Sequence, residues 1–385
     1  MNYVIFRKII FYFNSFIFNN IRGYSSNSWT GELIGLKVQL LLGFFYISLL
    51  LTGCEQSEKA VTISGQTMGT TYTIKIIGEN GYPFTPNKIK NDIDSILVEV
   101  NQQMSTYLPE SEISQFNRMK AGDDFTISND FVGVVERALT ISELTWGAFD
   151  ITVKPILDIW GFGPSASQQN QSEEFPPPEL IKQTLKSVGY TKLIVHETEL
   201  RKIDPDVTLD LNAIAKGFGV DKISEFCTQK GYDRYLIEIG GEVCCMGLNE
   251  NSVPWRIGID IPQPGSLPGQ QIGAVVPLLN QAMATSGDYR NFFQFGDQIY
   301  SHVIDPKTGY PVETNVASAT VIASTCMDAD ALATSLMVLG EKKGLALIES
   351  MDGVETLLII REGKDQFRTV KSSGMRTLKE EKTKR

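Results

Sequence analysis

Apolar and polar residues alternate along this chain with two different periods, and each period predicts one kind of element. From residue 61 the segment VTISGQTMGTTYTIKII alternates around Gly65 and Gly69, which predicts a pair of strands. The first helix is predicted from apolar residues that recur at helical spacing: Ile89, Ile93, Ile96, Leu97, Val100 and Met104. A second helix is predicted over residues 128–144, where Ser128 and Asn129 provide the signal of a helix start.

The second half of the chain mixes both periods. The predicted elements are a helix over 179–187, strands near 192–197 and 207–211, a helix over 212–230, mostly strands over 234–322, a helix over 327–339 that Gly340 stops, and a closing helix–strand unit, GLALIES and ETLLIIR. The proline-rich stretch 163–178 is predicted to be a surface loop. This order is neither strictly alternating nor all-strand, so the predicted fold class is α+β, with mixed, largely antiparallel sheets and packed helices.

The N-terminal region carries a targeting pattern. Lys37 precedes an apolar run over residues 40–51, and the sequence Leu-Thr-Gly ends at Cys54. A charged start, a short apolar core and small residues at the end are typical of a signal peptide. The last four residues also resemble a lipobox, in which the cysteine becomes the lipidated first residue. An ordinary transmembrane anchor is the alternative, although the run is shorter than the roughly 20 residues that a span needs.

These features predict the division of the chain. Residues 1–53 form the signal peptide region, whose true start we expect near residue 36 because Met1 lies far upstream. Residues 54–60 form a lipidated linker, residues 61–370 a single catalytic domain, and residues 371–385 a polar, disordered tail. We therefore expect a lipid-anchored protein whose catalytic part faces the periplasm or the cell exterior.

Charge and residue counts exclude several kinds of partner and site. The net charge of −10 argues against a nucleic-acid partner, which requires a basic face. His196 and His302 are the only histidines, so a site built from several histidines is excluded. No pair of cysteines has zinc-ligand spacing, and we expect the cysteines after Cys54 to be buried. An acidic chain that handles an anion needs a metal, a helix N-terminus or a few well-placed cations.

The start of the helix predicted over 327–339 carries a carboxylate and a hydroxyl on one face. Asp330 and Thr334 are four residues apart, and their oxygens suit a hard cation such as Mg²⁺. Thr325 and Asp328 have the spacing of a capping box, so Asp328 is the better capping residue and Asp330 the better ligand. Acids that only complement the helix dipole are the alternative interpretation.

A second candidate segment is LDLNAIAKGFG, residues 209–219, where a predicted strand gives way to a helix. Gly217 and Gly219 lie early in that helix, where each costs roughly 1 kcal/mol relative to alanine, which indicates close approach by a ligand or another backbone. Lys216 would lie in the first turn and could meet a phosphate there. An ordinary strand–helix junction is the alternative, and the Walker spacing is absent.

Weaker signals lie between these segments. Residues 286–290 form a polar turn that carries a cation, and residues 240–242, Gly-Gly-Glu, would let a flat group lie against the backbone. Residues 146–150, Trp-Gly-Ala-Phe-Asp, could seat an aromatic ring system. His302 ends a predicted strand, as either a structural or a catalytic residue.

Taken together, these segments resemble the ApbE family, the FAD:protein FMN transferases. The resemblance covers residues 61 to 365. The matching stretches follow the family order: GQTMGTTYTI, MSTYLPESEISQFN, GAFDITVKPILDIWGFG, LDLNAIAKGFGVDKI, IEIGGEV, ATSGDYRNFF, SHVIDPKTGYPV and DADALATSLMVLG. The resemblance implies an ApbE-like, T-fold-like catalytic domain.

The resemblance also implies roles for individual residues. FAD would be contacted by Met68, Tyr107, Ala148, Phe149, Asp150, Asp210, Lys216 and Ile304. Mg²⁺ would be held by the backbone oxygen of Ala213, by Asp330 and by Thr334, with a carbonyl from Ala333. Either Asp330 or His302 would accept the proton of the attacking hydroxyl.

The implied reaction is the cleavage of FAD and the attachment of FMN to a Ser or Thr of an acceptor protein, with release of AMP. The family's acceptors carry a short Ser/Thr-Gly-Ala-Thr-like motif, typically in membrane-associated redox subunits. Two other functions remain open at this stage. One is a Mg²⁺-dependent FAD pyrophosphatase in which water is the nucleophile, and the other is a non-enzymatic lipoprotein that binds FAD.

Overall fold

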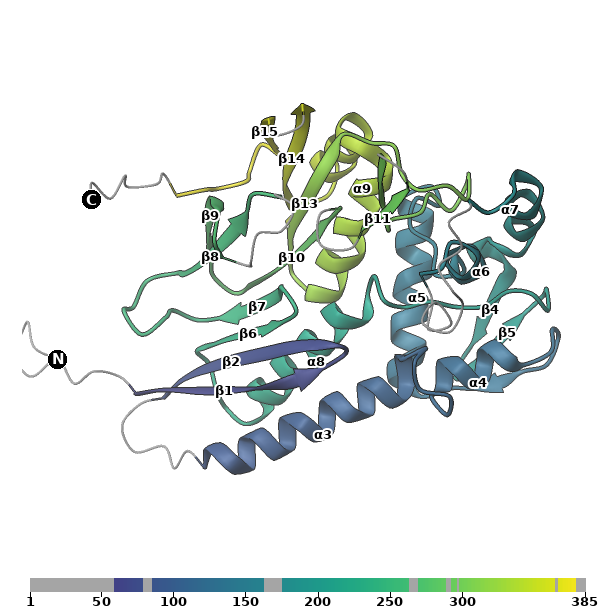
Figure 1. Ribbon diagram of the computed structural model, residues 1–385. Coiled ribbons are helices and arrows are strands. Elements are labelled where there is room, and N and C mark those ends of the chain that lie inside the picture. Colours follow the sequence, from purple (N-terminus) through teal and green to yellow (C-terminus); the bar gives the residue numbers. More distant parts are fainter. Residues whose placement is uncertain are drawn as a thin grey trace, which may run out of the picture. The chain divides into compact units, whose positions relative to one another are not determined.

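The computed structural model describes residues 59–78, 85–162, 175–262, 269–288, 292–295, 298–363 and 366–378 (Figure 1). The predicted signal peptide, Cys54, most of the linker and most of the 163–178 loop lie outside the described residues, as do residues 289–291. Within the described ranges, none of the helices has the length and apolar character needed to span a membrane.

An eight-stranded sheet organises the domain, and every strand pairs antiparallel with its neighbours. The first two strands form the predicted hairpin, which turns at Met68 and Gly69. In spatial order the strands are β1 (Lys59–Thr67), β2 (Thr70–Gly78), β6 (Tyr235–Ile239), β7 (Glu242–Met246), β10 (Gln281–Gly287), β13 (Val316–Ala323), β14 (Glu355–Gly363) and β15 (Gln366–Lys371). The predicted α+β class with a large antiparallel component is confirmed.

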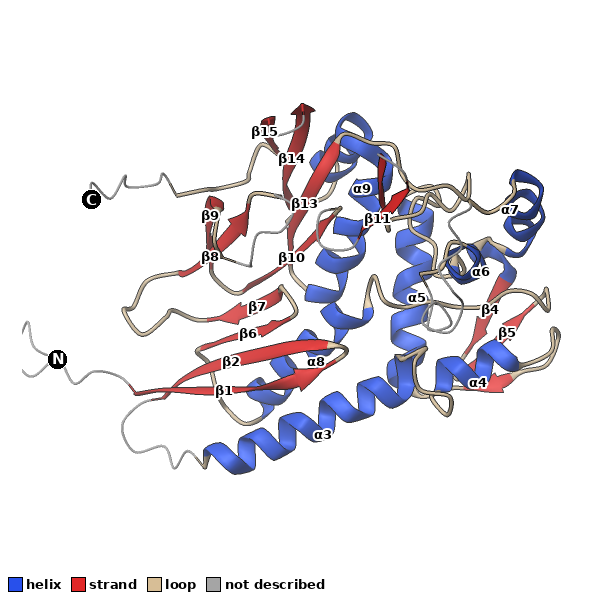
Figure 2. Ribbon diagram, in the orientation of Figure 1, coloured by secondary structure: helices blue, strands red, loops and turns tan. Residues whose placement is uncertain are grey.

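The two faces of this sheet are covered differently (Figure 2). Three helices lie on one face: α3 (Pro86–Met104), α8 (Ala215–Gln229) and α9 (Cys326–Glu349). On the other face, apolar residues of the sheet pack against β8 (Trp255–Asp260) and β9 (Ile272–Leu278). Successive residues of β7 point to opposite faces of the sheet. Cys244 therefore belongs to the cluster under α3 and α8, whereas Cys245 belongs to the cluster under β8 and β9.

A second group of elements follows α3 along the chain. Its centre is α5 (Asn129–Leu144), which packs with α9 in the largest hydrophobic cluster. Beside it in Figure 1 lie α4 (Glu112–Arg118), β3 (Phe125–Thr126), α6 (Lys154–Ile159), α7 (Pro178–Thr184), the 3₁₀ helices η2 (Leu185–Ser187) and η3 (Tyr190–Lys192), β4 (Leu193–His196) and β5 (Glu199–Lys202). The hairpin of β11 (Phe292–Phe295) and β12 (Gln298–Ser301) precedes β13 along the chain. The predicted N-cap Ser128 is confirmed, because its side chain accepts the Phe131 N–H.

The predicted strand over 207–211 is wrong. Val207, Leu209 and Leu211 are buried, as their alternation indicates. Their backbone, however, has no neighbouring strand: the Leu209 N–H donates to the Asn117 side chain, and the Asp210 N–H donates to the Ile151 carbonyl. The strand that pairs with β4 is β5 instead. The helix after this segment begins at Ala215, three residues later than the predicted 212.

One further predicted boundary is confirmed and another is wrong. Gly340 has a non-helical backbone with a φ of 72° and a ψ of 177°, so the helix that begins at Cys326 is interrupted there, as predicted, and a second helical segment runs on to Glu349. The first part of the tail is ordered rather than disordered, since Met375 is buried in the cluster with β8 and β9 and the Leu378 N–H donates to the Val275 carbonyl. The alternation of Met375 with polar neighbours is too short a pattern to indicate this packing.

Candidate active site

The starts of α8 and α9 meet, as the Mg²⁺ ligands implied by the family resemblance predicted. The Gly217 N–H in α8 donates to Asp330 Oδ2 in α9 at 3.0 Å. A Cβ on Gly217 would lie 2.3 Å from the backbone oxygen of Cys326, so only glycine admits the α9 backbone here. The close approach predicted from this glycine is therefore made by another backbone.

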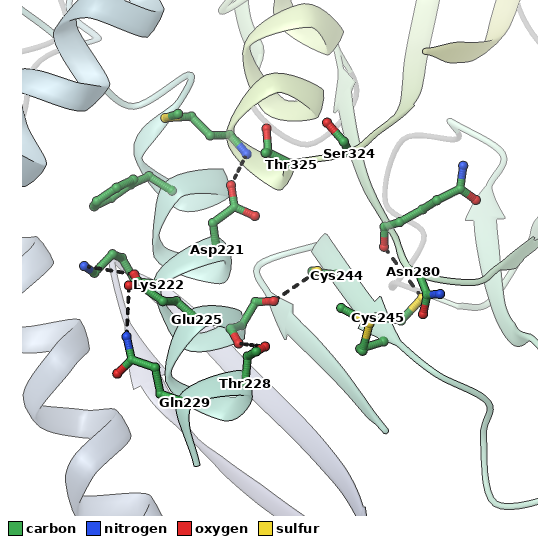
Figure 3. Close-up of a pocket in the computed structure, with 15 residues that line it drawn as sticks. Asp221, Lys222, Glu225, Thr228, Gln229, Cys244, Cys245, Asn280, Ser324 and Thr325 are labelled. Atoms are coloured by element: carbon green, nitrogen blue, oxygen red, sulfur yellow. Dashed lines mark hydrogen bonds and ion pairs between the residues drawn. The ribbon is translucent and has the colours of Figure 1, made fainter. Parts of the chain in front are cut away.

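A second contact between the same helices lies one turn further along α8. The Asp221 carboxylate accepts the backbone N–H groups of Cys326 and Met327, both at 2.8 Å. Figure 3 shows this side chain pointing at the first turn of α9. Burial raises the pKa of Asp221 to about 6, against the lowering effect of these hydrogen bonds. Together with the predicted N-cap Thr325, this carboxylate satisfies the N–H groups of the first turn of α9.

Asp330 is buried next to a cation. Its exposed fraction is 3%, and its Oδ1 atom lies 3.7 Å from Lys216 Nζ. The same ammonium donates to Glu242 Oε1 at 2.7 Å. Burial acts to lower the pKa of Lys216, but the Asp330 and Glu242 carboxylates outweigh it and raise that pKa. Lys216 is therefore a charged, half-buried side chain in the first turn of α8, as predicted.

Glu242 is the site residue that the sequence did not single out for chemistry. It is 4% exposed and begins β7, directly after the Gly240-Gly241 turn. Burial raises the pKa of Glu242, and the Lys216 ammonium opposes that shift. The available sequence signal was an acid at the start of a buried strand, but its partner on α8 is set only by the tertiary fold.

The proposed metal ligands supply the oxygens that Mg²⁺ prefers. Thr334 lies on the same face of α9 as Asp330, and its Oγ1 atom is 3.0 Å from Ser286 Oγ on β10. In a regular helix the Gly217 N–H would donate to the Ala213 carbonyl four residues earlier. Here it donates to Asp330 instead, which leaves the Ala213 carbonyl available to a metal. Ala333 is fully buried. A carbonyl, a carboxylate and a hydroxyl fit a hard divalent cation that keeps several waters.

In the described part of the chain, no three His, Cys, Asp or Glu side chains cluster in a way that could hold a metal. The oxygen set of Ala213, Asp330 and Thr334 contains only one carboxylate, so it does not depend on such a cluster. All four described cysteines are buried and free, as predicted.

Met68 lies against the same helix. It occupies the hairpin turn with a φ of 49°, and a Cβ on Gly219 would lie 3.1 Å from its methyl carbon. The second early glycine of α8 therefore makes room for Met68. This contact brings one of the predicted FAD residues to the helix that carries Lys216.

The segment 148–150 forms part of a second group of predicted residues. Ala148 and Phe149 are buried, and the Asp150 carboxylate accepts hydrogen bonds from the Thr152 backbone, the Thr152 hydroxyl and the Tyr190 backbone. Burial raises the pKa of Asp150, against these hydrogen bonds. The side chain is thus engaged within the protein, which leaves the backbone of the segment to meet a ligand.

Asp210 lies beside that segment. Its N–H donates to the Ile151 carbonyl at 2.8 Å, and its carboxylate accepts the Asn212 N–H at 2.8 Å. A cavity of about 340 Å³ opens beside residues 146–150 but does not include Asp210; it is lined by Trp146, Gly147, Asp150, Leu185, Val188, Gly189, Tyr190, Thr191, Pro306 and Lys307. The exposed Trp146 at its edge is consistent with the prediction that this segment could seat a ring.

The structure does not join three predicted residues to the Asp330 group. Tyr107 follows α3 and is 62% exposed. Ile304 is buried and pairs with Pro311 in an isolated bridge. His302 is partly exposed, two residues before Ile304. The roles assigned to these residues stay predictions.

A larger cavity of about 630 Å³ lies beyond the contact of α8 with α9 (Figure 3). Its lining includes Asp221, Lys222 and Thr325 and extends to Cys244 and Asn280, but it does not include Lys216, Asp330 or Thr334. No sequence pattern predicted this cavity, because it forms between elements far apart along the chain.

Comparison with known proteins gives a consistent result. The model of the ApbE family matches residues 68–358. A protein of Vibrio cholerae serotype O1 named FAD:protein FMN transferase is 40% identical over 328 residues, which cover 85% of this chain and 95% of that protein. A Haemophilus influenzae protein of the same name is 39% identical over 341 residues, which cover 87% of this chain and 96% of that protein.

The fold agrees with a solved structure, that of the flavin transferase ApbE from Vibrio cholerae. The two structures superpose with a TM-score of 0.73 at 38% identity, over 82% of this chain and 98% of that chain. The family model covers most of the sequence, and the matched residues include both helix starts that form the candidate site. This chain belongs to the ApbE family.

Proposed function

We propose that this protein is a Mg²⁺-dependent FAD:protein FMN transferase. The observation that carries the proposal is the junction of α8 and α9, where the buried Asp330 carboxylate accepts the Gly217 N–H and lies 3.7 Å from the Lys216 ammonium. Phosphoryl transfer depends mainly on positioning and on neutralising charge, and these groups provide both. The names of the relatives support FAD as the substrate and a protein as the acceptor.

The proposed mechanism assigns the site residues to the cation, to the phosphates and to the two halves of FAD. The Ala213 carbonyl, Asp330 and Thr334 hold the divalent cation, with Ala333 as a further carbonyl donor. When bound, that cation polarises the FAD diphosphate. Lys216 offsets negative charge on the phosphates, close to the N-terminus of α8. Met68, Tyr107, Asp210, Ile304 and the backbone of residues 148–150 orient the two halves of FAD.

The chemical step is an in-line displacement at the FMN phosphorus. The hydroxyl oxygen of an acceptor Ser or Thr forms a bond to phosphorus, and the bond from phosphorus to the bridging oxygen of AMP breaks. The hydroxyl proton passes to Asp330 or to His302. AMP leaves, and FMN stays on the acceptor through a phosphoester.

The location of the protein is part of the proposal. Lipidation at Cys54 would tether the catalytic domain to a membrane, on the periplasmic or extracytoplasmic side. Acceptors in membrane redox complexes would then lie within reach. The lipobox-like sequence before Cys54 supports this, together with the short apolar run that precedes it.

The test uses the full chain with FAD, Mg²⁺ and an acceptor protein that carries the Ser/Thr-Gly-Ala-Thr-like motif. We expect flavin fluorescence on the acceptor band of a denaturing gel and an equal amount of AMP. Asp330→Ala should fold normally and lose at least about 100-fold in rate, the order of a removed catalytic metal contact. Labelling by Asp330→Ala at the wild-type rate would contradict the metal assignment.

The same experiment separates the other two functions. Free FMN and AMP without labelled acceptor would favour the pyrophosphatase. Tight FAD binding without release of AMP would favour a binding lipoprotein. The presence of Asp330 and Thr334 on one face of α9 favours a metal-dependent reaction over binding alone, because binding does not require a metal at the diphosphate.

A further inference from the structure

Glu242 is a buried carboxylate that the proposed mechanism does not yet use. It reaches the junction of α8 and α9 from the sheet, at the start of β7. Its Oε1 atom accepts a hydrogen bond from Lys216 Nζ, whereas its Oε2 atom is buried and has no hydrogen-bond partner. Leaving a buried carboxylate oxygen unsatisfied costs free energy, so a purely structural role would be served better by a neutral side chain.

The Lys216 ammonium is shared unequally by two carboxylates. It lies 2.7 Å from Glu242 Oε1 and 3.7 Å from Asp330 Oδ1. The second distance is too long for a hydrogen bond. Lysine has a flexible four-carbon stem, so the ammonium could close this gap if Glu242 no longer held it. A direct ion pair between Lys216 and Asp330 would then occupy the oxygen that the metal needs.

We propose that Glu242 is a positioning residue that holds the Lys216 ammonium away from Asp330 Oδ1 and so keeps this oxygen open to the divalent cation. This inference rests on the proposed function, because it assumes that Asp330 is a metal ligand. It assigns Glu242 no contact with FAD. This role explains why Glu242 is buried beside Lys216 and Asp330, whose charges would already neutralise each other.

The test measures Mg²⁺ binding to the full chain by calorimetry, without FAD. Glu242→Gln keeps the size of the side chain but removes its charge. We expect it to raise the dissociation constant for Mg²⁺ about tenfold, since Lys216 then pairs with Asp330. Glu242→Asp keeps the charge and should stay within about threefold of the wild type. Its binding also reports on the proposal should Glu242→Gln fail to fold.

The decisive variant is the double substitution Glu242→Gln with Lys216→Met. It removes the competing ammonium, so Mg²⁺ affinity should return to within about threefold of the wild type although catalysis does not return. Asp221→Asn is the control for the loss of a charge alone. Asp221 also acts electrostatically on Asp330, but its hydrogen bonds go to the α9 backbone, so we expect a change of less than about threefold.

Each outcome decides the inference. Wild-type affinity in Glu242→Gln, no recovery in the double variant, or an equal loss in Asp221→Asn would overturn it. The proposed function would survive these results as long as Asp330→Ala abolishes Mg²⁺ binding. Mg²⁺ binding that does not depend on Asp330 would overturn the proposed function and this inference together.

Discussion

At the scale of single residues, position 217 sets how closely α8 and α9 approach. Gly217 brings its N–H to Asp330 and leaves room for the backbone at Cys326. Glycine is otherwise unfavourable within a helix. Its presence here is thus explained by the contact between the two helices rather than by the helix itself.

We expect Gly217→Ala to lower the free energy of unfolding by about 2 kcal/mol or more. The new Cβ would lie 2.3 Å from a backbone oxygen that cannot move alone, and this overpacking outweighs the gain in helix propensity. Gly219→Ala is the matched control, because the Met68 methyl at 3.1 Å can rotate away. Urea denaturation measures both variants, and an equal effect at the two positions would contradict the explanation.

At the scale of elements, the first turn of α9 is fixed by its neighbours. Asp221 on α8 accepts two of its N–H groups. Arg137 on α5 holds Asp328 through two hydrogen bonds of 2.5 and 2.8 Å. The Asp328 side chain therefore links α9 to α5, whereas the cap of α9 is the Thr325 hydroxyl, which accepts the Asp328 N–H. Asp330 follows in the next turn of the same helix.

The Asp221 contact predicts a pH dependence of stability. Burial raises its pKa to about 6 from the usual 3.8, so the folded protein binds this proton more tightly than the unfolded chain does. The resulting stabilisation is complete below about pH 4 and is lost as the pH rises through 6. Relative to Asp221→Asn, the wild type should lose up to about 3 kcal/mol over this range, measured by urea denaturation. A pH-independent difference would contradict the raised pKa.

At the scale of the whole molecule, patterns within short segments predicted the features that depend on neighbouring residues along the chain. The period of the apolar residues gave the helices and the first hairpin, and the spacing of Asp330 and Thr334 gave one face of the site. The segment 207–211 shows the limit: its alternation reported burial correctly, yet its backbone bonds to Asn117, 92 positions away. Such partners depend on how distant elements pack.

The same limit explains why the pairing of Glu242 with Lys216 could not be predicted. Lys216 lies on a helix and Glu242 on a strand, 26 positions apart, and they meet only after α8 packs against the sheet. The junction of the two helix starts was predicted only because the family resemblance connected two motifs more than a hundred residues apart. Distance along the chain, rather than weak local propensity, separates the predicted part of the site from the rest.

The C-terminal segment gives a prediction for the molecule as a whole, because it closes the layer of β8 and β9. Met375 is 6% exposed and packs with Trp255 and Leu357, whereas its neighbour Arg376 is exposed. We expect Met375→Ala to lower the free energy of unfolding by about 2–4 kcal/mol through the cavity that it leaves, and Arg376→Ala to change it by less than about 0.5 kcal/mol. Urea denaturation of the two variants tests this. Equal, small effects would mean that the segment after Lys371 adds nothing to the core, as the sequence pattern alone indicated.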